Sequence, residues 1–161
     1  MTSNHSNCTP SDPHVAASFI NIGAVYAGKG DFENALVQYQ KGLEIQTRVF
    51  GSDHPDVAGS FYTIGNVYRE KGDLENALVQ HQKALEIRTR VFGSEKHREV
   101  CSSFYNLACA HATRDSMLCR DMLLKAEQTG CLHLLKEHMK TDSDLDAVRE
   151  LEWCKELVRR I

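Results

Sequence analysis

Apolar residues in the first third of the chain recur at intervals of three and four, which is the spacing of one face of an α-helix. Phe19, Ile22 and Tyr26 follow this spacing, and we expect their face to be buried against a second helix that begins after residue 31. Lys29-Gly30-Asp31 separates the two helices, because glycine permits a helix to stop and aspartate can accept bonds from the next helix's free N–H groups. The pattern therefore predicts a helix pair.

The same pattern returns after 42 residues. When residues 12–53 are placed over residues 54–95, more than two thirds of the aligned positions are identical. A third and weaker copy spans residues 96–130 and lacks one residue in its internal turn. A helix pair of this kind cannot cover its own apolar face, so neighbouring pairs stack and share a core. The chain is therefore predicted to be all-α, an α-solenoid of about three helix pairs.

Residues 131–161 depart from the repeat and are predicted to form capping helices over the end of the array. A short amphipathic helix is expected around Leu132–Met139, followed by a polar break at residues 141–143 and a last helix that carries Trp153 and Leu157. Residues 1–11 are mostly polar and are predicted to be a disordered tail.

Small and aromatic residues occupy matching positions in the two strong copies, and their spacing resembles the tetratricopeptide repeat. These residues are Phe19, Ile22, Gly23, Tyr26, Ala35, Tyr39 and Gly42, matched by Phe61, Ile64, Gly65, Tyr68, Ala77, His81 and Ala84. The 42-residue period and the HPDVA, KGDLENAL and KALEI segments are more specifically similar to the long repeats of kinesin light chains and nephrocystin-like proteins. The resemblance implies a right-handed superhelix whose concave groove holds peptides or helices of other proteins, without catalysis.

The resemblance covers about residues 13–129. The segment FYNLACAHA and residues 142–157 are also similar to the ending of many such arrays. The third copy departs from the family pattern, because His111 replaces the usual tyrosine and the turn glycine is missing.

The other side of the first helix of each copy carries mostly small and polar residues, which stack into one stripe along the array. Two tyrosines of the stripe can anchor a partner, and its asparagines can pair with the backbone of an extended peptide. The alternative is that its apolar members pack on a neighbouring first helix. The predicted binding residues are Ile20, Asn21, Ala24, Tyr62, Asn66, Arg69, Tyr105, Asn106 and Cys109.

Chaperone-tail binders of the resembled family clamp a terminal carboxylate with groove Lys, Arg and Asn residues. The matching positions here hold no cation, which argues against such a clamp; they are Ile20, Ala24, Thr63, Ser102 and Asn106. Arg69 is the one positive charge of the stripe, and Glu70 beside it partly offsets that charge. A ligand of mixed apolar and polar character is therefore expected.

The overall charge excludes one class of partner. Lys and Arg total 19 against 22 Asp and Glu, for a formal charge of −3, so no excess of cations exists to neutralise nucleic-acid phosphates. No run of about 18 apolar residues occurs, so neither a membrane span nor a membrane partner is expected. The six cysteines lack the spacing of a disulfide framework, which favours a cytoplasmic protein with reduced thiols.

The sequence argues against three kinds of chemical site: a zinc site, a cysteine–histidine nucleophile and a calcium loop. Cys131, His133 and His138 lack the paired spacing of a zinc site, and a cysteine–histidine nucleophile has no orienting third group. Asp142 and Asp144 begin an alternation typical of a calcium loop, but the glycine and distal glutamate of that loop are missing, so helix capping explains them better. We therefore expect no metal, no cofactor and no enzymatic activity.

The function predicted from these observations is a protein-interaction module that holds a peptide or helix of a partner protein in its groove. The alternative is a structural role as the end of a larger repeat assembly. In that case the chain forms a homo-oligomer through the first helix of the first copy, which has no cap before it.

Overall fold

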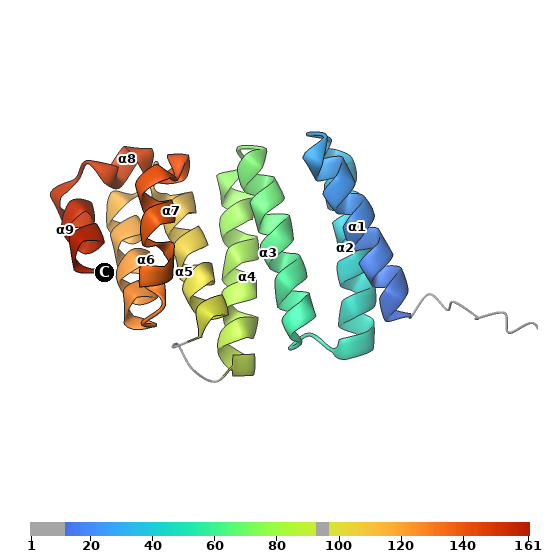
Figure 1. Ribbon diagram of the computed structural model, residues 1–161. Coiled ribbons are helices and arrows are strands. Elements are labelled where there is room, and N and C mark those ends of the chain that lie inside the picture. The colour runs from blue at the N-terminus through green and yellow to red at the C-terminus, as the bar shows by residue number, and fades with distance from the viewer. Residues whose placement is uncertain (1–11, 93–96) are drawn as a thin grey trace, which may run out of the picture.

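The structure is an array of three helix pairs followed by a set of shorter helices (Figure 1). It is a computed structural model that describes residues 12–92 and 97–161. The predicted tail at residues 1–11 lies outside this part. The first helices of the pairs are α1 (Pro13–Gly28), α3 (Pro55–Glu70) and α5 (Arg98–His111), and the second helices are α2 (Phe32–Phe50), α4 (Leu74–Phe92) and α6 (Ser116–Gln128). The predicted α-solenoid of three helix pairs is confirmed.

The turn within the first pair has the predicted form. Gly30 adopts a positive φ of 76°, which suits glycine because it has no Cβ. The N–H of Asp31 donates to the carbonyl of Tyr26 at 3.0 Å, and its side chain accepts from the N–H of Asn34 at 3.2 Å. A free carbonyl in the last turn of α1 and a free N–H in the first turn of α2 thereby find hydrogen-bond partners. The second pair repeats the arrangement at Gly72 and Asp73.

Small residues let the two helices of a pair approach closely. A Cβ atom on Gly23 would lie 3.0 Å from the ring of Tyr39, and one on Gly65 would lie 2.7 Å from the ring of His81. A larger residue at either position would have to displace a buried ring. Glycine is therefore needed at the helix crossing of the first two pairs, where the second helix places a ring.

A buried polar link joins each pair to the next. The Ser60 hydroxyl of α3 donates to Gln46 of α2 at 2.5 Å. At the corresponding position of the next interface, Arg88 of α4 donates to the hydroxyl of Ser103 at 2.8 Å and forms a 2.9 Å ion pair with Glu99. The repeat thus preserves the location of the link while changing its chemistry from neutral to charged.

One expectation about the first pair is wrong. Ile22 was expected to face the second helix of its own pair, but its side chain is 46% exposed, whereas Ile64, the matching residue of α3, is 3% exposed. The reason is that this position faces the preceding pair. In α3 it packs on α2, while the described residues place no helix before α1.

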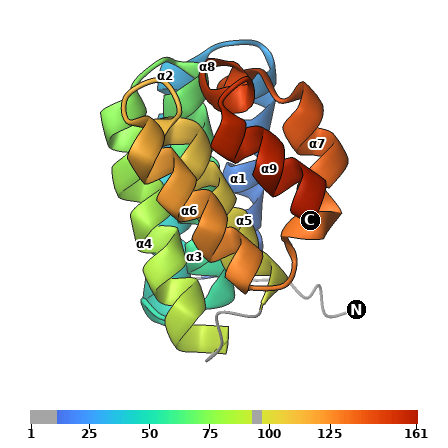
Figure 2. The same cartoon turned by 90° about the vertical axis from the view of Figure 1, so that its left-hand side faces the viewer.

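The remaining elements cover the last pair from its end and from the side of the first helices (Figure 2). Five elements follow one another: η1 (Leu132–Leu135), α7 (Lys136–Thr141), η2 (Ser143–Leu145), α8 (Asp146–Arg149) and α9 (Glu152–Arg160). The expected polar break falls at Asp142, between α7 and η2. Leu132, Met139, Leu145 and Leu157 are fully buried in one cluster with the residues of α5 and α6, so these elements are part of the core.

Candidate functional site

The predicted stripe divides into a part that solvent reaches and a part that the chain itself covers. In α1, Asn21 and Ala24 are exposed. Ile20 is half-buried, and its Cγ1 atom lies 2.9 Å from the place a Cβ of Gly42 would occupy, so its side chain packs on α2. The α1 section therefore offers a polar and a small residue, with Ile20 as an apolar border.

The α3 section combines an aromatic ring with buried polar groups. Tyr62, Asn66 and Arg69 are all half-buried. The Tyr62 ring lies 4.9 Å from the guanidinium carbon of Arg88 and 5.8 Å from the ring of His81. Arg88 thus holds the Tyr62 ring by a cation–π contact, which orients this candidate anchor.

Two side chains of the second pair carry buried polar atoms without a partner among the described residues. The Oδ1 atom of Asn66 and both ring nitrogens of His81 have no hydrogen-bond partner among the described residues. Burial, together with the positive charges of Arg69 and Arg88, lowers the pKa of His81 to about 4, so the ring is neutral at pH 7. The first pair has Tyr39 at the place of His81.

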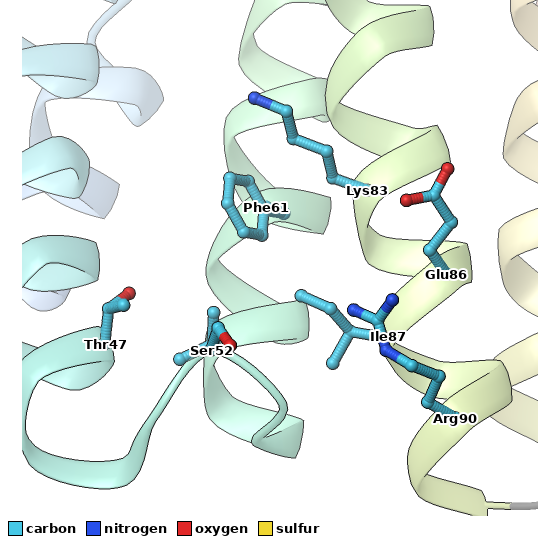
Figure 3. A pocket seen from close by; sticks show the side chains of 8 residues that line it. Thr47, Ser52, Phe61, Lys83, Glu86, Ile87 and Arg90 are labelled. Atoms are coloured by element: carbon cyan, nitrogen blue, oxygen red, sulfur yellow. The ribbon is translucent and has the colours of Figure 1, made fainter.

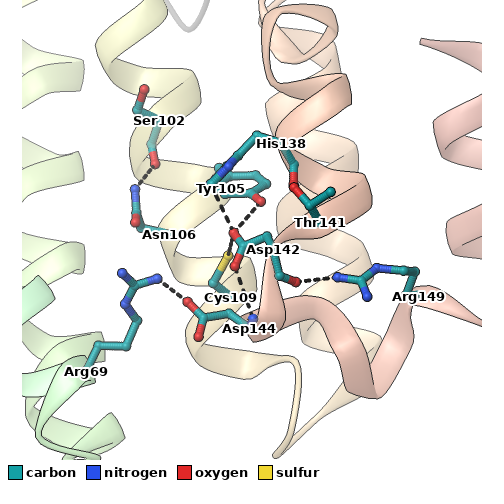
Figure 4. Close-up of polar contacts among 10 residues, drawn as sticks. All are labelled: Arg69, Ser102, Tyr105, Asn106, Cys109, His138, Thr141, Asp142, Asp144 and Arg149. Atoms are coloured by element: carbon teal, nitrogen blue, oxygen red, sulfur yellow. Dashed lines mark hydrogen bonds and ion pairs between the residues drawn. The ribbon is translucent and has the colours of Figure 1, made fainter.

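The α5 section of the stripe is covered by the chain's own C-terminal residues. We name residues 132–149, from η1 to α8, the covering segment. Tyr105, Asn106 and Cys109 are all buried, so these three predicted binding residues are closed to a partner in this structure. The Tyr105 hydroxyl donates to Asp142 Oδ2 at 2.6 Å, and the Cys109 thiol lies 3.7 Å from the same oxygen (Figure 4).

Asp142 is the centre of this contact (Figure 4). Besides Tyr105 and Cys109, its carboxylate lies 3.2 Å from His138 Nε2 and accepts from the N–H of Asp144 at 3.0 Å. Burial opposes ionisation of Asp142, but the bonds from Tyr105 and from the Asp144 N–H outweigh it and hold the pKa of this carboxyl below its usual value. Asp142 is therefore an ionised side chain fixed against α5.

The single cation of the stripe is also engaged by the covering segment. Arg69 of α3 forms an ion pair with Asp144. This partner lies 75 residues further along the chain, whereas the sequence pointed only to the neighbouring Glu70. Arg69 thereby ties the second pair to the covering segment.

The Cys109–Asp142–Asp144 group has ligand atoms that lie within 4.8 Å of one another. Thiolates and carboxylates can bind zinc, but a thiol must lose its proton to do so. Burial, with the negative charges of Asp142 and Asp144, raises the pKa of the Cys109 thiol, and the guanidinium of Arg69 already pairs with Asp144. These side chains therefore suit a hydrogen-bonded contact better than a metal.

A hollow remains between the open and the covered sections of the stripe. It measures about 180 Å³ and lies where α3, α5 and α7 meet. Tyr62 and Arg69 line it from α3, Tyr105 from α5, and His138 and Leu135 from the covering segment. The repeat pattern gives no signal for the contribution of the covering segment, because the residues of this segment lie outside the repeat.

A second hollow, of about 220 Å³, lies on the side of the second helices (Figure 3). Phe61 lines it together with Ile87 and with Ser52 of the turn between α2 and α3. Its charged rim is largely self-paired, because Arg90 forms a 2.8 Å ion pair with Asp53 and the Lys83 ammonium lies 5.3 Å from the Phe61 ring. No sequence motif marked this hollow.

None of the described helices is both long enough and apolar enough to cross a lipid bilayer.

The comparisons with known proteins agree with the fold. The model of the family described as "Tetratricopeptide repeat" matches residues 14–90 and 56–116. No curated protein matches the sequence significantly. The BtubC (BKLC) structure from P. vanneervenii is similar, with a TM-score of 0.74 and 18% identity over 92% of this chain and 63% of that one. The present chain thus spans less than two thirds of that structure.

Two further structures are similar at comparable identity. A Podosopora anserina protein described as a kinesin light chain with nearly identical TPR-like repeats has a TM-score of 0.71 and 17% identity, over 96% of this chain and 78% of that one. The N-terminal domain of stress-induced protein-1 from C. elegans has a TM-score of 0.55 and 17% identity, over 91% of this chain and 94% of that one. At these identities the structures share the fold, while the family match covers most of the three helix pairs. The chain belongs to the tetratricopeptide repeat family.

Proposed function

We propose that the chain is an interaction module that holds a segment of a partner protein along the open section of the stripe, formed by α1 and α3. Scaffolds of this repeat type bind proteins in general. The observation that carries the proposal is the state of Asn66, a half-buried stripe residue whose Oδ1 atom has no partner among the described residues. Rotation of this amide would present its carbonyl to a backbone N–H of a partner.

The covering segment supports the proposal by example. It is a stretch of polypeptide that lies on α5 and satisfies the polar groups of the stripe there, through Tyr105 and Asp142. Apart from Arg69, which pairs with Asp144, the corresponding residues of α1 and α3 have no such cover among the described residues. A partner segment that lies on them would extend the same kind of contact.

The covering segment sets the length of the proposed site. Four of its apolar side chains are fully buried: Leu132, Met139, Leu145 and Val148. Burial of one such side chain is worth about 1.5–3 kcal/mol, so their removal would cost roughly 6–12 kcal/mol. A partner segment would not repay that cost. The proposed site therefore ends at the hollow beside His138, and the partner contacts two helix pairs.

The charges of the site favour a partner without a strongly acidic end. Arg69 already pairs with Asp144, and Asp142 nearby is ionised. An additional carboxylate would meet two negative charges and no unpaired cation of the stripe. An apolar or aromatic side chain beside Tyr62, with backbone hydrogen bonds to Asn21 and Asn66, fits better. Catalysis is not part of the proposal, and the absence of enzymatic activity stays a prediction.

The test uses the full chain and a library of short displayed peptides. The selected peptide is then titrated against three variants: Tyr62→Ala, Asn66→Ala, and Val79→Ala as a control on the exposed side of α4. We expect at least a tenfold weaker affinity for the first two and no change for the third. Asn66→Ala should leave thermal stability unchanged or raise it, because it removes a buried acceptor without a partner.

Two outcomes would contradict the proposal. One is a library that yields no peptide at micromolar affinity. The other is a peptide whose affinity is the same for Tyr62→Ala and Asn66→Ala as for the unmodified chain, while circular dichroism shows that both variants are folded.

A further inference from the structure

The outer face of α1, which points away from α2 and α3, carries residues that the other first helices bury. Ile22 and Val25 are 46% and 58% exposed, whereas Ile64 and Val67, the same residue types at the same repeat positions in α3, are each 3% exposed. The identity of the side chains is unchanged, so only the surroundings differ. A preceding second helix covers α3, and the described residues place none against α1.

α1 also carries the serine of the polar link that joins neighbouring pairs. Ser18 stands at the repeat position of Ser60 and Ser103. The Ser103 hydroxyl donates to the carbonyl of Glu99 at 3.0 Å while it accepts from Arg88 of the preceding helix. The Ser18 hydroxyl makes the same local bond, to the carbonyl of His14 at 2.9 Å, and it is exposed. It can therefore still receive a bond from outside.

We propose that the outer face of α1 docks the second helix of a tetratricopeptide pair from a partner protein. The contact would continue the interface that α2 makes with α3 and that α4 makes with α5. The docked helix would cover Ile22 and Val25 and place a polar side chain on Ser18. This surface lies on a different side of α1 from the open section of the stripe, so the proposal is independent of the proposed function.

A second copy of the chain does not fit this role, because each of its own second helices is already covered. In the structure α2 packs on α3 and α4 packs on α5. The buried face of α6 packs in one cluster with the residues of the covering segment and α9, and Glu127 of α6 pairs with Arg160 at 2.7 Å. A copy would have to unfold part of its core to offer such a helix.

The charges near Ser18 select the type of docked helix. Arg88 of α4 needs the carboxylate of Glu99, which lies one turn before Ser103. The matching position in α1 is His14, which is no carboxylate. A helix of the α4 type would therefore leave its arginine without a counter-charge, whereas a helix of the α2 type, with glutamine at the position of Gln46, needs only the hydroxyl.

The probe for the test is a synthetic peptide with the sequence of residues 31–51, stapled between the exposed positions 37 and 41 to keep it helical. It is titrated by fluorescence anisotropy against the full chain, against Ile22→Glu and against Val37→Glu, a matched change at an exposed apolar residue of α2. We expect saturable binding to the full chain and to Val37→Glu, and at least a tenfold loss for Ile22→Glu. The peptide with alanine in place of Gln46 should bind several-fold more weakly.

Three results would overturn the proposal. Binding that does not saturate excludes the docked helix. Binding that Ile22→Glu leaves unchanged shows that the peptide enters elsewhere, for example by replacing the chain's own α2. A concentration-dependent dimer, seen by light scattering and abolished by Ile22→Glu, assigns the outer face to a second copy. The stripe variants Tyr62→Ala and Asn66→Ala should not alter peptide binding, so failure of this proposal is distinguishable from failure of the stripe.

Discussion

Replacement of His81 by leucine should stabilise the protein, and by an amount that grows as the pH falls. His81 is completely buried, and neither ring nitrogen has a partner among the described residues. The third pair has Leu123 at the same repeat position, also fully buried, so a side chain of this size and shape suits the crossing. A buried polar group without a partner costs about 1–3 kcal/mol, and this is the gain expected at neutral pH.

The pH dependence follows from the lowered pKa of His81. An unfolded histidine has a pKa of 6.5, and the folded value is about 4. Between these values the unfolded chain binds more protons than the folded chain. Protonation of His81 therefore does not affect the stability of the fold above about pH 6.5, and it lowers that stability progressively as the pH falls toward 4. Between pH 7.5 and pH 4.5 the loss of stability amounts to about 2–3 kcal/mol, at roughly 1.4 kcal/mol for each pKa unit.

Urea unfolding at several pH values measures this effect. The difference in unfolding free energy between His81→Leu and the unmodified chain should widen by about 2–3 kcal/mol from pH 7.5 to pH 4.5. Val79→Ala, a change at an exposed residue of α4 that does not titrate, should show no such widening. Parallel pH profiles for His81→Leu and the unmodified chain would refute the assignment of His81 as a buried neutral residue.

Three further changes test other contacts by urea unfolding. Arg88→Ala should destabilise the chain by about 2–4 kcal/mol, because it removes the bond to Ser103 and the ion pair with Glu99 and leaves a cavity in the second interface. Arg88→Gln, which imitates the first interface, should cost less; equal losses would contradict the role of the link. Tyr105→Phe should lower the unfolding free energy by about 1.5–3 kcal/mol. Acid unfolding should also begin at a higher pH, because the variant lacks a bond that keeps the pKa of Asp142 low. An unchanged acid transition would argue against that bond. Gly30→Ala should destabilise the chain by about 1 kcal/mol, because Gly30 has a positive φ. Gly28→Ala should be neutral or stabilising, because a Cβ there would have no neighbour within 4 Å. The reverse order would refute the described conformation of the turn.

The helix pairs could be predicted because their cause is local and repeated. The spacing of apolar residues determines which face of each helix is buried, and Gly30 and Asp31 determine where one helix ends and the next begins. Each device occurs again 42 residues later, so the second copy supports the interpretation of the first. The polar break at Asp142 was predictable for the same reason, because its side chain caps η2.

The covered section of the stripe could not be predicted in this way. The contact of Tyr105 with Asp142 and the ion pair of Arg69 with Asp144 join the repeats to residues that belong to no repeat. Periodicity carries no information about such contacts. The exposure of Ile22 could not be predicted for a different reason. Burial at this position depends on a preceding helix pair. The matching residue of α3 has such a neighbour, and α1 has none among the described residues.

The unequal links between the pairs imply that the array does not open uniformly. The buried polar link of the first interface is one neutral bond between Gln46 and Ser60, and α1 exposes its outer face. The buried link of the second interface includes an ion pair, and the last pair is held by the covering segment. Because each pair touches only its neighbours, the cost of local opening should rise from the first pair to the third. Amide hydrogens of α1 and α2 should then exchange with solvent faster than those of α5 and α6. A partner that lies across α1 and α3 would slow the exchange in the first pair, and part of its binding free energy would be spent on that ordering.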